Sequence, residues 1–135
     1  MSNLQLSLKR QWFDMTKSLI KLEDYRDINE YWIKRLFECY APEEEKGENK
    51  VNAENSIFDI EHNGYDPRDV LNVYGFVPKE FTQNTMTLGY PKSGDTERII
   101  KFEHSGIEIR TGNPEWGAEP GKLYFVIKHG KLITE

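Results

Sequence analysis

Strand patterns at both ends of the chain, with helical patterns gathered between them, constrain the fold most. Near the N-terminus, Leu4, Leu6 and Leu8 alternate with polar residues, which is the period of a half-buried strand. Near the C-terminus, residues 123–128 are rich in β-branched and aromatic side chains and predict the strongest strand of the chain. This arrangement favours an α+β fold over an alternating βαβ fold. We expect a small, strongly bent mixed sheet or barrel with flanking helices, in a single domain that spans residues 1–135.

The first third of the chain beyond the initial strand carries mainly helical patterns. Residues 9–19 place their apolar side chains at helical spacing and predict a short amphipathic helix that includes Leu19. Residues 21–26 then read as an extended segment. Asp27 or Asn29 can cap a second helix that extends to Cys39.

The middle of the chain is marked by turn-forming residues. Residues 41–50 lack periodicity and predict an exposed acidic loop, and residues 56–60 predict a short strand. The pair Asp66-Pro67 predicts the start of a helix of one or two turns. Residues 89–95 predict a hairpin turn, after which alternation returns over residues 100–109 and predicts strand.

Composition excludes several classes of protein. The chain has 135 residues, of which 37% are hydrophobic, and this suffices for one packed core. The net charge is -5, but residues 38–66 hold nine acidic and two basic residues, so the rest of the chain can present a local basic surface. No apolar run approaches the roughly 20 residues that span a bilayer, and no secretory signal is visible. We therefore expect a cytoplasmic protein with no membrane partner.

Cysteine and histidine give no sign of a metal site. Cys39 is the only cysteine, which excludes an internal disulfide and a cysteine-rich zinc site. His62, His104 and His129 are scattered and lack the spacing of a metal-binding motif. The glycine-rich fingerprints of nucleotide-cofactor folds are also missing. The sequence thus predicts neither a metal nor a cofactor.

Residues 21–26 are the strongest candidate for chemistry. Lys21, Glu23, Asp24, Tyr25 and Arg26 place two cations, two carboxylates and a phenol within six positions. Such cations can hold a phosphate, a carbonyl or a base edge, and a neighbouring carboxylate can orient them or move a proton. Strand alternation predicts that Lys21, Glu23 and Tyr25 lie on one side and Asp24 and Arg26 on the other. The alternative is an ordinary charged edge strand held by mutual salt bridges.

The glycine- and proline-punctuated loop of residues 111–121 is a second candidate. Its Trp116 could stack on a base, and Glu115 adds a carboxylate beside the ring. The alternative is a tryptophan that plugs the end of the barrel.

Two stretches of the chain resemble one known family. The resemblance to the opening of ASCH domains, whose signature is Gly-x-Lys-x-x-Glu-x-Arg, lies in Leu6-Ser7-Leu8-Lys9 with Trp12-Phe13-Asp14-Met15, followed by residues 18–26. Residues 113–128 resemble the closing loop and strand of small phage-type and bacterial ASCH proteins. With the turn at 89–95 and the strand after it, the resemblance covers roughly two-thirds of the chain. Residues 41–88 look like an acidic insertion or a divergent stretch.

The resemblance implies a PUA-like fold with a cleft that binds RNA or a modified nucleobase. Carried over residue by residue, Lys21 matches the signature lysine, Arg26 the arginine and Asp24 the glutamate, with Glu23 as the alternative carboxylate. Leu19 occupies the glycine position and departs from the signature. The family also includes an N4-acetylcytidine amidohydrolase, in which a threonine nucleophile stands at the position of Asp24, and members reported as ribonucleases.

Three functions follow as hypotheses. The first is a module that binds single-stranded RNA, a nucleotide or a nucleobase, through Lys9, Lys21, Glu23, Asp24, Tyr25, Arg26, Glu115 and Trp116. The second is a hydrolase of the same family, with Lys21 and Asp24 (or Glu23) as catalytic residues. The third is a phage or mobile-element accessory protein whose acidic loop, residues 43–48, contacts a host protein. The oligomeric state stays open.

Overall fold

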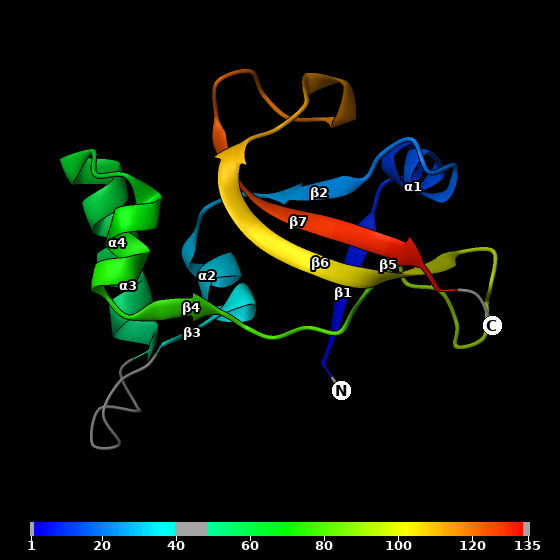
Figure 1. Ribbon diagram of the computed structural model, residues 1–135, viewed down its shortest axis with the longest axis horizontal. Coiled ribbons are helices and arrows are strands. Elements are labelled where there is room, and N and C mark those ends of the chain that lie inside the picture. Colours follow the sequence, from blue (N-terminus) through cyan, green and yellow to red (C-terminus); the bar gives the residue numbers. More distant parts are fainter. Residues whose placement is uncertain (1, 40–48, 134–135) are drawn as a thin grey trace.

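A curled five-stranded sheet is the centre of the molecule (Figure 1). The computed structural model describes residues 2–39 and 49–133. The strand order is β1-β5-β6-β7-β2, and β1 runs parallel to β5 while the other neighbouring strands are antiparallel. The strands are β1 (Asn3–Leu8), β2 (Glu23–Arg26), β5 (Gln83–Leu88), β6 (Ile99–Thr111) and β7 (Leu123–Leu132). The predicted α+β class and strongly bent mixed sheet are confirmed. The sheet forms a half-barrel, with β1 and β2 as its two edges.

Over the described ranges, four helices and a small two-stranded ribbon accompany this sheet. The helices α3 and α4 gather on one side of it, and α1 lies at its other end (Figure 1). The ribbon pairs β3 with β4 in antiparallel orientation. The bounds are α1 (Arg10–Lys17), α2 (Glu30–Leu36), β3 (Phe37–Cys39), α3 (Asn49–Asn63), α4 (Pro67–Val73), β4 (Phe76–Pro78) and a short 3₁₀ turn (Pro114–Trp116).

The strand β6 gives the sheet its curl. It is 13 residues long and visibly bent in Figure 1. Its pairing with β7 shifts register on both sides of His104. Gly106 has a φ of 118°, a backbone conformation that favours glycine. A register shift of this kind bends a strand and increases its twist, so the sheet wraps around its inner face instead of lying open.

One hydrophobic core joins the sheet to the helices. Side chains from the inner face of the sheet pack with those of α2, and buried residues of α3, α4 and β4 extend the same cluster. Phe125, near the start of β7, is fully buried, and burying a side chain of this size stabilises a fold by about 1.5–3 kcal/mol. The residues that form this core include Leu4, Leu6, Ile33, Leu36, Ala53, Leu71, Phe76, Met86, Phe102, Phe125 and Ile127.

Several locally encoded elements are as the sequence predicts. The alternation of residues 4–8 forms β1, with buried leucines and exposed polar residues. Asn29 caps α2, because its side chain accepts a hydrogen bond from the N–H of Trp32 at 2.9 Å. Asp66 caps α4, and Pro67 occupies its first turn.

Three predictions about secondary structure are wrong. Residues 56–60 are part of α3 and not a strand, because Ala53, Ser56 and Ile57 follow helical spacing and face the core side of α3. The helix α1 ends at Lys17, so Leu19 is outside it. Cys39 ends the strand β3 and does not belong to α2. The expected acidic loop of residues 41–50 lies mostly outside the described residues.

Candidate functional site

A left-handed turn directs the chain from α1 into β2. Leu19 has a φ of 61°, and within the part of the chain that the structure describes it is the one non-glycine residue with a positive φ. The N–H groups of Ile20 and Lys21 both donate to the carbonyl of Met15, at 3.0 and 3.1 Å, and close the end of α1. This turn leaves Leu19 half-exposed and brings the side chain of Lys21 inward.

Lys21 is buried and paired. It is 2% exposed, and its Nζ donates to the carbonyl oxygen of Glu23 at 2.6 Å and to Oδ1 of Asp24 at 3.1 Å. The ring of Tyr25 lies 5.4 Å from the same ammonium. A lysine is almost never fully buried unless it is paired. The two oxygen atoms supply that pairing.

Asp24 holds two cations at once. Its Oδ1 accepts from Lys21 and its Oδ2 accepts from Nε of Arg26 at 2.8 Å. Burial raises the pKa of Asp24, but the charges of Arg26 and Lys21 and their hydrogen bonds outweigh it, so the pKa lies below its usual value. The carboxylate is therefore ionised, and both of its oxygens are engaged.

Arg26 extends from this group to the opposite edge of the sheet. Its Nη2 donates to the carbonyl of Ser7 in β1 at 3.1 Å, and its guanidinium lies 4.9 Å from the ring centre of Trp32. Arg35 of α2 makes the same two kinds of contact two residues earlier on β1. Its Nη2 donates to the carbonyl of Gln5, and its guanidinium lies 5.5 Å from the ring centre of Trp32. We call the edge of β1 where these two arginines meet the carbonyls of Gln5 and Ser7 the seam.

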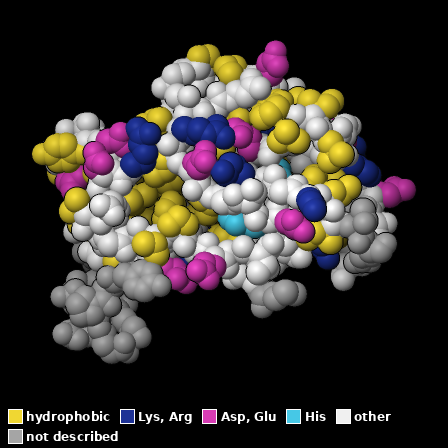
Figure 2. Space-filling view, in the orientation of Figure 1, with side chains coloured by type: hydrophobic (Ala, Val, Ile, Leu, Met, Phe, Trp, Pro, Cys, Tyr) yellow, Lys and Arg dark blue, Asp and Glu magenta, His cyan; other side chains and the backbone are white. Residues whose placement is uncertain are grey.

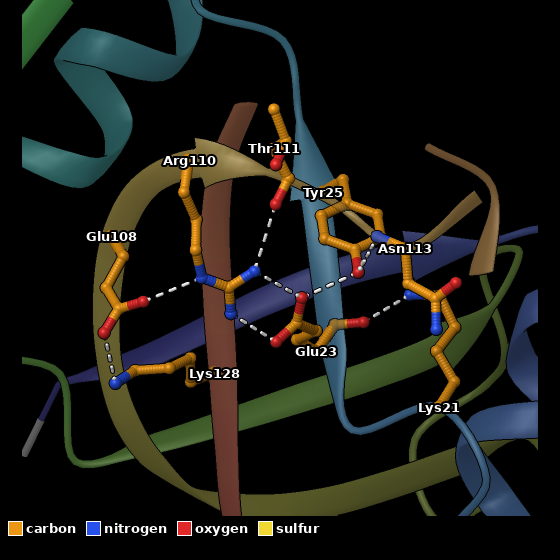
Figure 3. A network of polar contacts seen from close by, with 8 residues as sticks. All are labelled: Lys21, Glu23, Tyr25, Glu108, Arg110, Thr111, Asn113 and Lys128. Carbon is orange, nitrogen blue, oxygen red and sulfur yellow. Dashed lines mark hydrogen bonds and ion pairs between the residues drawn. The ribbon is translucent and has the colours of Figure 1, made fainter. Parts of the chain in front are cut away.

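The outer face of β2 carries a second polar network (Figure 3). Both carboxylate oxygens of Glu23 accept from Arg110 of β6, and Oε2 also accepts from the hydroxyl of Tyr25 at 2.6 Å. Glu108 extends the network by accepting from Arg110 at 2.9 Å and from Lys128 at 2.8 Å. On the face shown in Figure 2, acidic and basic side chains intermingle over the sheet, so opposite charges compensate there.

These contacts set the protonation of the outer network. Burial raises the pKa of Glu23, but hydrogen bonds from Arg110 and Tyr25 outweigh it, so the pKa is lowered. Burial and donation to Glu23 raise the pKa of Tyr25 to about 12. Glu23 is thus ionised, and Tyr25 is a neutral donor near neutral pH.

The loop of residues 111–121 is fastened to β2 through Tyr25. The Tyr25 hydroxyl accepts from the N–H of Asn113 at 2.8 Å. At Gly112 an added Cβ would lie only 2.6 Å from the Tyr25 ring, so the backbone passes directly against the ring. Gly117 packs just as closely on Trp12 of α1. The loop therefore lies between β2 and α1.

The predicted site residues fall into two groups. Asp24 and Arg26 lie on the inner face of β2, opposite Ile127 and Phe125 of β7, while Glu23 and Tyr25 lie on the outer face, as alternation predicts. The ammonium of Lys21 reaches Asp24. The remaining three stand apart from the Asp24 carboxylate: Lys9 is exposed just before α1, Glu115 is exposed and Trp116 is half-buried in the 3₁₀ turn.

A buried amide links two histidines near one end of the sheet. Nδ2 of Asn84 donates to the carbonyl of Lys128 at 3.1 Å and lies 2.9 Å from Nδ1 of His129, which therefore accepts. Oδ1 of Asn84 lies 2.7 Å from Nδ1 of His104, which therefore donates. Nε2 of His129 carries the proton and is buried without a partner among the described residues. Burial lowers the pKa of His129 to about 4.

A cavity of about 490 Å³ has none of the predicted site residues in its lining. It opens between the segment that precedes α2, the helices α3 and α4, and the start of β7, and its lining includes the ion pair of Lys122 with Asp27 at 3.1 Å. The lining residues are Asp27, Ile28, Asn29, Ile60, Glu61, Pro67, Lys122 and Leu123.

Sequence reasoning missed Arg110, Arg35 and Trp32 as members of these networks. Alternation along β6 places Arg110 on the outer face, but its partner Glu23 is 87 positions away. The cation–aromatic spacing of Trp32 and Arg35 is visible in the sequence, since residues three apart on a helix are neighbours. That spacing was the available signal for the seam.

Comparisons with known proteins give no family. The chain matches no protein-family model, no curated protein and no solved structure. Over residues 2–39 and 49–133, none of the helices combines the length and the apolar composition that crossing a membrane requires. The same residues hold no cluster of three or more His, Cys, Asp or Glu side chains arranged for a metal ion.

Proposed function

We propose that this protein is an ASCH-type, PUA-like domain that binds a nucleotide or single-stranded RNA at the seam, with Arg26 as the residue that faces the phosphate. The observation that carries this proposal is the sharing of Asp24 between Lys21 and Arg26, at the three positions where the ASCH signature has its charged residues. Asp24 fixes the guanidinium of Arg26 through Nε, while Nη2 is directed toward β1. An oriented guanidinium suits a phosphate because it presents several N–H groups in one plane.

The backbone of Leu19 supports the same family. Leu19 stands where the signature has glycine, and its φ of 61° is a conformation that glycine adopts without strain. The curled mixed sheet with flanking helices is also the architecture that a PUA-like fold requires.

The burial of Lys21 supports different roles for the three residues of the site. The Lys21 side chain is 1% exposed and that of Asp24 is 8% exposed, whereas that of Arg26 is 20% exposed. Arg26 is therefore the member that a phosphate can reach, and Lys21 and Asp24 are positioning residues. A general base needs a pKa near the working pH, and the lowered pKa of Asp24 makes it a poor one. This favours binding over the hydrolase alternative.

The test is a titration with uridine monophosphate and with a short oligouridylate at low and moderate salt. The wild-type protein should bind both, and Arg26→Gln should weaken binding of both by about 10-fold or more, since a hydrogen bond to a charged group contributes about 1.5–3 kcal/mol. Arg26→Lys, which keeps the charge but not the planar fork, should fall between them. Absence of binding by the folded wild-type protein, or full binding by folded Arg26→Gln, would reject the function.

A further inference from the structure

Among the residues that the structure describes, one arginine of the seam, Arg35, has no carboxylate partner. The chain has six arginines, and five of them form an ion pair with a carboxylate. For Arg35, the described residues offer only the Tyr31 hydroxyl, at 3.3 Å from Nη1, and the carbonyl of Gln5. Both partners are neutral. Within this part of the chain, Arg35 thus adds a positive charge beside β1 that no carboxylate balances.

The two guanidiniums of the seam donate to carbonyls that are regularly spaced along β1. Their acceptors, the carbonyls of Gln5 and Ser7, are two residues apart on one strand, which is about 6.6 Å at the usual rise of a strand. Neighbouring phosphates of an extended single strand are separated by a similar distance. Each guanidinium has five N–H groups, and within the described residues each uses two of them. Nε of Arg35 is buried, so three N–H groups of Arg26 and two of Arg35 are left. Both arginines can therefore bind an oxyanion without releasing β1.

An exposed aromatic ring lies next to these cations. Tyr31 is 57% exposed and contacts the edge of the Trp32 ring, with the two ring centres 5.0 Å apart. An exposed ring beside a row of cations is the arrangement that single-strand binders use, since the ring stacks on a base and the cations follow the backbone.

Resting on the proposed function, we infer that the seam binds a polynucleotide strand and not only a mononucleotide. Arg26 and Arg35 each bind one of two adjacent phosphates, and Tyr31 stacks on a neighbouring base. The substrate class is single-stranded RNA of at least two phosphates. Duplex nucleic acid is not favoured, because its bases are already stacked and leave no face for Tyr31.

A purely structural role for Arg35 predicts a different outcome. Unpaired backbone groups on an edge strand attract other strands, and Arg35 covers one of them on β1. If that is its whole role, removing its charge changes stability but not the salt dependence of RNA binding. The discriminating measurement is therefore the slope of log affinity against log salt concentration.

The experiment compares oligouridylate with uridine monophosphate across a series of salt concentrations. Arg35→Gln keeps an amide donor for the Gln5 carbonyl and should lower the oligouridylate slope by about 0.7, the value for one phosphate contact in a single strand. It should also lower the ratio of oligouridylate to monophosphate affinity. Arg35→Lys should retain the wild-type slope. Tyr31→Ala should weaken oligouridylate binding by roughly 5- to 150-fold, and Tyr31→Phe should not.

The matched control is Lys131→Gln. Lys131 is an exposed cation of β7, six residues from Phe125, the partner of Arg26, and so about 20 Å along the strand. An unchanged slope in folded Arg35→Gln, or equal binding of an acidic peptide of the same length, would overturn the inference while leaving Arg26-dependent monophosphate binding in place. Absence of any nucleotide binding would instead overturn the proposed function and this inference together.

Discussion

Removing the ammonium of Lys21 should destabilise the protein strongly. The side chains of Lys21 and Asp24 are 1% and 8% exposed, so Lys21→Met breaks a buried ion pair and deprives the Glu23 carbonyl of its donor. Breaking such a pair typically costs 3–5 kcal/mol. Because Arg26 continues to neutralise Asp24, we expect the lower end, about 3 kcal/mol. Asp24→Asn leaves two cations without their carboxylate and should cost about 5 kcal/mol.

The free energy of unfolding is measured by urea titration, followed by the fluorescence of the three tryptophans. The control is Arg10→Met, since Arg10 and Asp14 form an ion pair at 3.7 Å with side chains that are 68% and 56% exposed. That substitution should change stability by less than about 0.5 kcal/mol. The double variant Lys21→Met with Asp24→Leu should be less destabilised than the sum of the single variants, because it leaves no half of the pair behind. A loss below about 1 kcal/mol for Lys21→Met would refute the reasoning.

Three further outcomes are expected. Leu19→Gly should raise the free energy of unfolding by about 0.5–1 kcal/mol, because relief of the left-handed backbone exceeds the added entropy of the unfolded chain; a loss in the urea titration would contradict this. Burial lowers the pKa of His129 in the folded protein to about 4, below the value of about 6.5 in the unfolded chain. The free energy of unfolding should therefore be highest above about pH 6.5 and should fall by up to about 3 kcal/mol as the pH decreases from about 6.5 to about 4. His129→Gln should reduce this loss between neutral and acidic pH, and an equal loss in the variant would argue against it. Tyr25→Phe should cost about 2 kcal/mol and accelerate amide exchange at Asn113, and unchanged exchange there would show that the hydroxyl does not hold the loop.

Secondary structure could be predicted from the sequence where residues close in the chain determine it. The cap at Asn29 follows from a side chain and a backbone three residues away, and β1 follows from simple alternation. The helix α3 was not readable, because the residues that face its core side include the small Ala53 and the polar Ser56. Ser56 satisfies its hydroxyl by donating to the carbonyl of Asn52 at 2.7 Å, so it is buried at low cost. Hydrophobic periodicity does not reveal a helix whose buried side includes a small and a polar residue.

In the candidate site, too, some features follow from the local sequence and others do not. Alternation placed Glu23 and Tyr25 on the face of β2 opposite Asp24, because it depends only on the strand itself. The burial of Lys21 could not be read, because lysine is exposed in most proteins and its acceptors become available only when β2 is in place. The contact of Arg26 with Ser7 depends on how far the sheet curls, and one sequence does not encode that curl in any short segment.

The strand order of the sheet has a consequence for how the chain folds during synthesis. β1 is made first, yet its partner begins with the pairing of Asn3 and Gln83, 80 positions later. β2 waits longer, since Arg26 pairs with Phe125. At about 5–20 residues per second, the ribosome needs on the order of 5–20 s to deliver β7 after β2 has emerged. β1 lacks its partner until β5 is made, and β2 lacks its partner for the whole interval. Because such distant pairings also slow folding, the nascent chain is most exposed to proteases and chaperones at these two strands.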